Sequence, residues 1–175
     1  YNAVKTSGLT TLRVELPAGG SAAHAALGVQ FAAYRFDRYR TKEPADKKPS
    51  IAKTQVVAAD ADKALAAFAP LAALADAVAF SRDLVSEPPN VLYPAEFARR
   101  VKALESLGLE VEILGEAEME KLGMGSLLGV GQGSTRESQL AVIKWYGAAD
   151  KSAQPIAFVG KGVCFDTGGI SIKPA

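Results

Sequence analysis

The stretch IAFVGKGVCFDTGGISIKPA, residues 156–175, joins a short apolar run to a cluster of glycines, lysines and one aspartate. Residues 156–159 are apolar at every position, which predicts a strand that is buried on both faces in the middle of a sheet. In an open α/β sheet, ligands bind beyond the carboxyl ends of the strands. We therefore expect the polar residues that follow Val159 to lie at a ligand-binding edge.

The sequence before residue 156 alternates between helical and strand patterns. Strands are predicted over residues 9–16, 51–57, 109–113 and 140–146, and helices over residues 21–39, 61–85, 95–107 and 116–122. This order favours an α/β fold, with a domain boundary between residues 76 and 88.

Several residues are suited to begin or end these elements. Ser21 is a suitable N-cap for the first helix, and either Asp60 or Asp62 is placed to cap the second. Pro70 is expected to kink the second helix, and Gly108 to end the third. The glycine-rich run 129–135 lacks the G-x-G-x-x-G spacing of nucleotide-binding loops, so we expect a structural turn there.

The composition of the 175-residue chain excludes several classes of protein. A single cysteine, Cys164, excludes an internal disulfide and favours a reducing compartment. Because His24 is the one histidine, a zinc cluster of cysteines and histidines is also excluded. The net charge of +1 gives no support for nucleic-acid binding, and a hydrophobic content of 49% is too high for a disordered chain.

The beginning of the chain and its most apolar stretch bear on its location in the cell. The first residues, YNAVK, include neither an initiator methionine nor the apolar core of a signal peptide, so we expect a processed or partial chain. Residues 64–80 are the most apolar, but they are too few for a membrane span and include Pro70 and Asp76. These features predict a soluble, cytoplasmic protein with no membrane partner.

The residues after Val159 include types that suit a metal site. Lys161, with its amine unprotonated, and Asp166 are able to bind a hard metal ion, while Lys173 would remain a free cation that polarises a carbonyl group. Judged on residue types alone, a surface ion pair between Lys161 and Asp166 and a solvated Lys173 are the more frequent arrangement. Both interpretations stay open at this point.

Three further features are more often structural than functional. His24 is expected to be a core or surface histidine, and Cys164 a buried and inert thiol. The basic and aromatic run 34–40 either contacts an acidic partner or, more often, packs one face of a helix and exposes the other.

Several motifs occur in an order that resembles one known family. The segment VGKGVCFDTGGISIKP, residues 159–174, resembles the metal-site segment of the leucyl aminopeptidase family, also called cytosol aminopeptidases. SRDLVSEPPN (81–90) is similar to that family's R-D-L-x-N-x-P-x-N motif, and GMGSLLGVGQGS (123–134) to its glycine-rich stretch. The resemblance covers residues 80–175 well and the preceding residues only loosely, through GVQFAAYRFD (28–37).

The resemblance implies both a domain organisation and a set of site residues. Residues 1–78 would be a partial amino-terminal α/β domain with a linker helix, and residues 79–175 the first part of an α/β metallopeptidase catalytic domain. Lys161 would be a ligand of one metal ion and Asp166 a carboxylate that bridges two ions. Lys173 would hydrogen-bond to the scissile carbonyl group and polarise it.

The same resemblance implies an activity, cofactors and partners. The family releases amino-terminal residues, leucine in particular, from peptides by means of a hydroxide that two metal ions activate. The ions would be manganese or zinc, with magnesium as a further choice, and a bicarbonate would act as the base. The assembly implied is a homohexamer.

Two motifs of the family, M-x-x-D-M-x-G-A and N-T-D-A-E-G-R, carry the remaining ligands and are expected to follow residue 175. Since Lys161 and Asp166 offer too few donors for two ions, we expect this chain to be inactive as a separate polypeptide. The alternative is a non-catalytic interaction module, or an inactive fragment that pairs with another chain.

Overall fold

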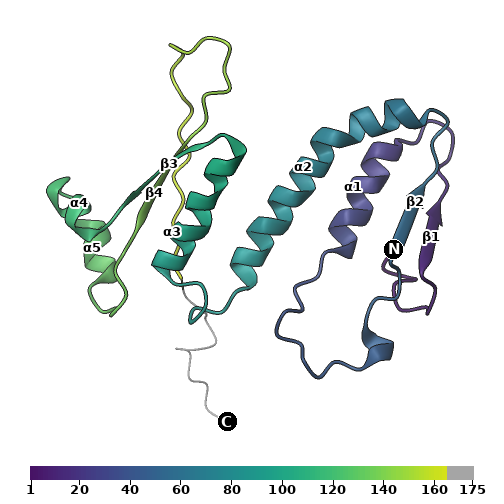
Figure 1. The fold of residues 1–175 in the computed structure, drawn as a ribbon, viewed down its shortest axis with the longest axis horizontal. Helices are drawn as coiled ribbons and strands as arrows, with labels where there is room; N and C mark the ends of the chain where they lie inside the picture. Colours follow the sequence, from purple (N-terminus) through teal and green to yellow (C-terminus); the bar gives the residue numbers. More distant parts are fainter. Residues whose placement is uncertain (165–175) are drawn as a thin grey trace. The chain divides into compact units, whose positions relative to one another are not determined.

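The computed structural model describes residues 1–164 and divides the chain into two compact units, Tyr1–Ser86 and Glu87–Ala175 (Figure 1). Each unit contains both helices and a pair of strands. The expected α/β class is therefore confirmed.

The first unit is built on a parallel strand–helix–strand arrangement. Its elements are β1 (Thr11–Val14), α1 (Ala22–Ala33), the short 3₁₀ helix η1 (Ala45–Lys47), β2 (Lys53–Val56) and α2 (Ala61–Ser86). Strands β1 and β2 pair in parallel, with Thr11 opposite Lys53 and Val14 opposite Val56. Parallel strands need a crossover connection, and α1 with the loop after it supplies one. Helix α1 packs along α2 and also contacts β2 (Figure 1).

The predicted caps of both long helices in this unit are present. The Ser21 side chain accepts a hydrogen bond from the backbone N–H of His24, so Ser21 is the N-cap of α1. The Oδ1 atom of Asp60 accepts a hydrogen bond of 3.0 Å from the backbone N–H of Lys63. Asp60, rather than Asp62, therefore caps α2.

The prediction of a helix as far as residue 39 was wrong. Helix α1 ends at Ala33, because Tyr34 leaves the helical conformation with φ −55° and ψ 133°. The side chain of Tyr34 is bound to α2 through Asp83, so a tertiary contact overrides the helical pattern of the following residues. Residues 34–40 are consequently a loop and not a helix face.

Helix α2 is a single helix of 26 residues that contains Pro70. Its inner side packs on α1 and includes the buried Ala75, whereas Leu65, Leu74 and Val85 are exposed. Of the helices within residues 1–164, α2 is the one that is sufficiently long and apolar to cross a membrane, judged by length and composition alone. Residues 64–80 were judged too few for a membrane span, but the helix that contains them, predicted over residues 61–85, is long enough by this criterion. Helices that pack inside other proteins meet the same criterion, so the lack of a membrane partner stays a prediction.

The second unit places a helix on a two-stranded antiparallel sheet. Its elements are α3 (Pro94–Lys102), the 3₁₀ helix η2 (Ala103–Leu107), β3 (Glu110–Leu114), α4 (Glu116–Lys121), α5 (Gly125–Gly131) and β4 (Leu140–Lys144). Strands β3 and β4 pair with Glu110 opposite Lys144 and Leu114 opposite Leu140. Helix α3 contacts both strands, and Val101 of α3 and Val111 of β3 are buried. Gly108 ends η2 with φ +85°, a conformation that favours glycine, as expected.

Two predictions for the second unit were wrong. The glycine-rich run 129–135 was expected to be a turn, but residues 129–131 lie in α5 and the turn begins only at residue 132. A Cβ atom at Gly131 would lie 2.1 Å from Oγ of Ser138, so this glycine permits a close approach of the chain to itself.

Residues 156–159 were expected to form a central strand but have no regular structure, and Phe158 is 93% exposed. The physical reason is the lack of a partner: within residues 1–164, β3 and β4 pair only with each other, and no strand runs beside this segment. An apolar sequence cannot become a central strand without two neighbouring edges to satisfy its backbone groups.

Candidate functional site

Lys161, the predicted metal ligand, lies in the extended segment that follows the exposed apolar run. Its neighbour Gly162 rests on the ring of Phe97, since a Cβ atom at Gly162 would lie 2.9 Å from Cε1 of that ring. Helix α3 therefore supports the backbone next to Lys161. On the other side, a Cβ atom at Gly160 would meet open space.

The other two predicted site residues, Asp166 and Lys173, lie outside the described residues 1–164. Their positions relative to Lys161 therefore stay a prediction. Within residues 1–164, no three histidine, cysteine, aspartate or glutamate side chains lie close enough together to hold a metal ion. One amine cannot hold an ion by itself, so this part of the chain does not form a metal centre.

Cys164 follows Lys161 by three residues and is half-buried. Burial raises the pKa of its thiol, which favours the protonated form. This agrees with the expectation of an inert thiol, because the thiolate is the reactive form of cysteine.

A network of charged side chains holds the beginning of α3. The carboxylate of Glu87 is fully buried and accepts a hydrogen bond of 3.1 Å from Arg100. Arg100 and Arg99 also donate to Glu96, at 2.8 Å and 2.6 Å. The hydrogen bonds from Arg99 and Arg100 lower the pKa of Glu96 to about 2. Glu87 lies between α2 and α3 in the chain, so this network fixes the segment that leads into α3.

A second contact supports the same helix. The guanidinium group of Arg136 lies 3.7 Å from the centre of the Tyr93 ring, which is a cation–π distance. Tyr93 is the N-cap residue of α3, and Arg136 belongs to the loop before β4. The loop between α5 and β4 is thus attached to α3, the helix that supports residues 160–162.

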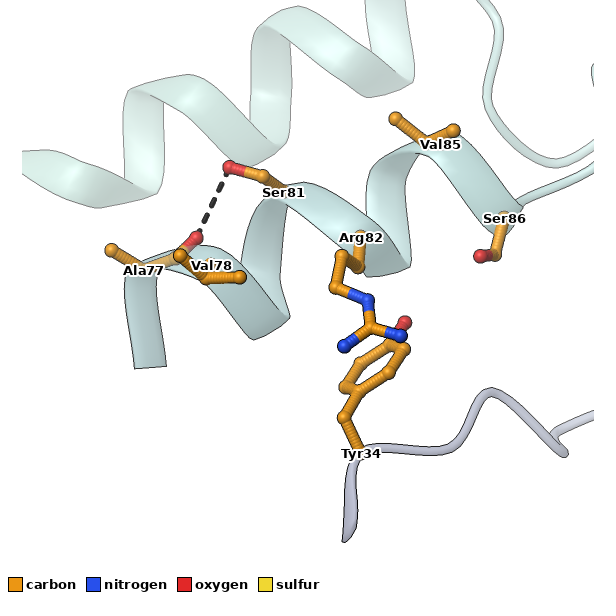
Figure 2. A pocket seen from close by; sticks show the side chains of 7 residues that line it. All are labelled: Tyr34, Ala77, Val78, Ser81, Arg82, Val85 and Ser86. Atoms are coloured by element: carbon orange, nitrogen blue, oxygen red, sulfur yellow. Dashed lines mark hydrogen bonds between the residues drawn. The ribbon is translucent and has the colours of Figure 1, made fainter. Parts of the chain in front are cut away.

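A pocket in the first unit lies beside the carboxyl end of α2 and has a volume of about 470 Å³. Figure 2 shows its lining, which consists of Tyr34, Ala77, Val78, Ser81, Arg82, Val85 and Ser86. The guanidinium group of Arg82 lies 3.8 Å from the centre of the Tyr34 ring. The lining offers one cation, hydroxyl groups and short apolar side chains, but it does not pair a nucleophile with a base.

The hydroxyl group of Tyr34 is bound by Asp83, a residue that does not line this pocket. It donates a hydrogen bond of 2.7 Å to Oδ1 of Asp83. Burial, together with this hydrogen bond, raises the pKa of Tyr34. The sequence pattern does not predict this contact, because Tyr34 and Asp83 are separated by 49 residues and no periodicity connects them.

After Tyr34, several side chains of the basic and aromatic run 34–40 pair within the loop that follows α1. Arg35 pairs with Glu43, and Arg40 lies 3.7 Å from the same carboxylate. Phe36 and Tyr39 meet edge to face, with 5.7 Å between ring centres. Since part of its charge is neutralised within the loop, the run gives less support to an acidic partner than its composition indicated.

A family model described as "Cytosol aminopeptidase family, catalytic domain" matches residues 79–175. The probable cytosol aminopeptidase of Caulobacter vibrioides is 71% identical over 176 residues, which is 100% of this chain and 36% of that protein. The probable cytosol aminopeptidase of Afipia carboxidovorans is 53% identical and covers 94% of this chain, or 34% of its own length. The chain therefore spans about a third of the length of these relatives.

Two solved structures share the fold. The bottromycin maturation enzyme BotP in complex with Mn is 28% identical, with a TM-score of 0.66, over 81% of this chain and 30% of that enzyme. A mutant tomato leucine aminopeptidase has the same TM-score of 0.66 at 23% identity, over 77% of this chain and 28% of that one. The second likeness shows the fold alone.

Proposed function

The chain belongs to the cytosol aminopeptidase family, and from this we propose that the full-length protein is a metal-dependent aminopeptidase that releases amino-terminal residues, leucine in particular, from peptides. The observation that carries the proposal is the match of the catalytic-domain model to residues 79–175, the part of the chain that contains Lys161. The related enzyme BotP was solved in complex with Mn, which supports a divalent metal ion as the cofactor here.

Three residues would act in this reaction. The amine of Lys161, when unprotonated, would donate its lone pair to one metal ion, and the carboxylate of Asp166 would bridge two ions because it has two oxygen atoms. The ammonium group of Lys173 would hold the scissile carbonyl group by a hydrogen bond and polarise it. When bound, manganese, zinc or magnesium ions would supply Lewis acidity and an activated nucleophile at neutral pH.

The chain as it stands would be inactive. Within residues 1–164 the acidic side chains do not gather around Lys161, and the chain spans about a third of its relatives. The remaining ligands, and a bicarbonate that acts as base, would be held by the rest of the full-length protein. A cytoplasmic location, which the names of the relatives support, and a homohexameric assembly belong to the same proposal.

The proposal is tested by assaying the full-length protein and the 175-residue chain in parallel. After chelation and return of Mn²⁺ or Zn²⁺, we expect leucine amide to be hydrolysed by the full-length protein and not by the chain. Lys161→Ala should remove activity and weaken Mn²⁺ binding in calorimetry. The matched control is Lys151→Ala, which removes an exposed lysine from the loop after β4.

Three results would contradict parts of this proposal. Turnover by the 175-residue chain would show that the ligand set is complete without further sequence. An active full-length Lys161→Ala variant would remove Lys161 from the ligand set. An inactive full-length protein that nevertheless binds a separate chain would favour the alternative of a non-catalytic interaction module.

A further inference from the structure

The side chains of Tyr34, Arg82 and Asp83 form one contact cluster within the first unit, beside the carboxyl end of α2. Tyr34 is the first residue after α1, and Arg82 and Asp83 are consecutive residues near the end of α2. The Arg82 guanidinium group lies 3.8 Å from the centre of the Tyr34 ring (Figure 2), and the Asp83 carboxylate accepts a 2.7 Å hydrogen bond from the Tyr34 hydroxyl. The two residues of α2 therefore bind one tyrosine at its face and at its hydroxyl group.

Arg82 also acts on the end of α1 itself. One of its guanidinium nitrogens donates to the backbone carbonyl of Phe31 at 3.4 Å. The last carbonyl groups of a helix have no partner inside the helix, and that end carries a partial negative charge. Helix α1 has no basic residue in its own last turn. Arg82 supplies from α2 the positive charge that α1 lacks.

The loop that starts at Tyr34 needs such an anchor. It runs from the end of α1 at Ala33 to the start of β2 at Lys53 and contains a single turn of 3₁₀ helix. A long loop without regular structure loses conformational entropy when it is ordered, and contacts at its ends offset that loss.

Arg82 and Asp83 could serve either the reaction or the fold, and the contacts of the cluster favour the fold. The family model for the catalytic domain begins at residue 79, so both residues belong to the matched segment. Nevertheless, their contacts are with Tyr34 and Phe31, and the compact first unit extends to Ser86. We propose that Arg82 and Asp83 form a clamp that fixes the loop after α1 to the end of α2, and that they take no part in peptide hydrolysis.

The clamp is tested by hydrogen exchange at the backbone amides of residues 31–36 in the full-length protein. Tyr34→Phe removes the hydroxyl donor, and we expect roughly tenfold faster exchange in this variant; Asp83→Asn replaces the charged acceptor with a weaker amide oxygen, so the increase there should be smaller. The double variant should exchange no faster than Tyr34→Phe alone, because residue 83 has no hydroxyl to accept from once the donor is gone. Arg82→Lys keeps the charge but loses the planar stacking group, so exchange should rise there as well.

The control is Asp76→Asn, which removes an exposed carboxylate two turns earlier on the same helix and should leave exchange unchanged. Hydrolysis of leucine amide by Asp83→Asn should stay within about twofold of the unmodified protein, because a local opening of this loop leaves the ligand residues intact. Unchanged exchange in the Tyr34 and Asp83 variants would overturn the clamp, as would additive effects in the double variant. A loss of turnover in Asp83→Asn with unchanged exchange would instead place Asp83 in the reaction. The exchange result holds whether or not the protein proves to be an aminopeptidase, so the two proposals fail separately.

Discussion

At the scale of single residues, Glu96 is the group whose ionisation the surrounding structure changes most clearly. Two arginines one turn further along α3 hydrogen-bond to its carboxylate and lower its pKa from 4.5 to about 2. Between these two values the folded protein keeps Glu96 ionised, whereas the unfolded chain binds a proton. The unfolded state therefore binds more protons in this window, and the stabilisation from Glu96 is lost as the pH falls from above 4.5 towards 2.

This gives a prediction for acid unfolding. In urea titrations, the stability difference between the unmodified protein and Glu96→Gln should be full at pH 6 and should shrink as the pH falls towards 2. The carboxyl resonance of Glu96, followed by NMR, should titrate near 2. A titration close to 4.5 would show that the arginines do not hold this carboxylate in solution.

Glu87 should be more sensitive to substitution than its position between two helices suggests. Its carboxylate is fully buried and is bound to Arg100, so Glu87→Gln replaces a charge-assisted hydrogen bond with a weaker one. We expect the free energy of unfolding to fall by about 1–3 kcal/mol in urea titrations. The control is Glu105→Gln, where a solvent-exposed pair with Lys102 is removed and the loss should be below about 1 kcal/mol. Equal losses in the two variants would contradict the importance of burial at Glu87.

At the scale of elements, the ends of the helices show which of them could be predicted from nearby residues alone. Ser21 and Gly108 were recognised as caps, and Asp60 as one of two candidates, and all three act as caps, because a cap depends on residues within one turn. The end of α1 at Ala33 could not be predicted, because it depends on a contact with Asp83 that lies far along the chain. The helical state of Gly129 was missed for a different reason: glycine disfavours helices in general, whereas here it lies in a short helix that packs against α4.

The contact between Phe97 and Gly162 connects α3 to the segment that carries Lys161. A methyl group at residue 162 would lie 2.9 Å from the ring, and an aromatic side chain has little freedom to move away. In the full-length protein we expect Gly162→Ala to lower stability by about 1–3 kcal/mol, and Phe97→Leu in the same chain to recover part of this loss. Thermal unfolding and the kcat for leucine amide would measure both effects.

Gly160→Ala is the matched control for that experiment. A Cβ atom at residue 160 meets no other atom within 4 Å, so this substitution should be tolerated in stability. If Gly160→Ala and Gly162→Ala behave alike, the ring of Phe97 does not set the path of the chain next to Lys161.

At the scale of the whole molecule, the structure has two compact units, and the family match crosses the border between them. The first unit ends at Ser86, whereas the match begins at residue 79. The predicted division at residues 78 and 79 stays a prediction. The order of the motifs was sufficient to identify the family from the sequence. The arrangement of Lys161, Asp166 and Lys173 stays a prediction, because the last two residues lie outside the described residues 1–164.

The exposed apolar run gives a prediction for the full-length protein. Residues 156–159 have the composition of a central strand but no neighbouring strand within residues 1–164, and this chain spans only 36% of its Caulobacter relative. We expect backbone amides of residues 156–163 to exchange quickly in the 175-residue chain and at least roughly a hundredfold more slowly in the full-length protein. Strand β2 (Lys53–Val56) should exchange at similar rates in both and serves as the control. Equally fast exchange in both proteins would show that this run is not a strand in the complete fold.

The exposed run also has a consequence for the solubility of the separate chain. The sequence IAFVGKGV, residues 156–163, is extended, apolar and without a pairing partner in the described residues, which is the signature of a segment that seeds fibrils. Lys161 is its one charge, and a charge inside such a segment acts as a gatekeeper against self-association. Lys161→Ala in the 175-residue chain should therefore increase thioflavin T binding and light scattering, independently of any metal. The same lysine would then protect the nascent chain from aggregation before the proposed metal site forms.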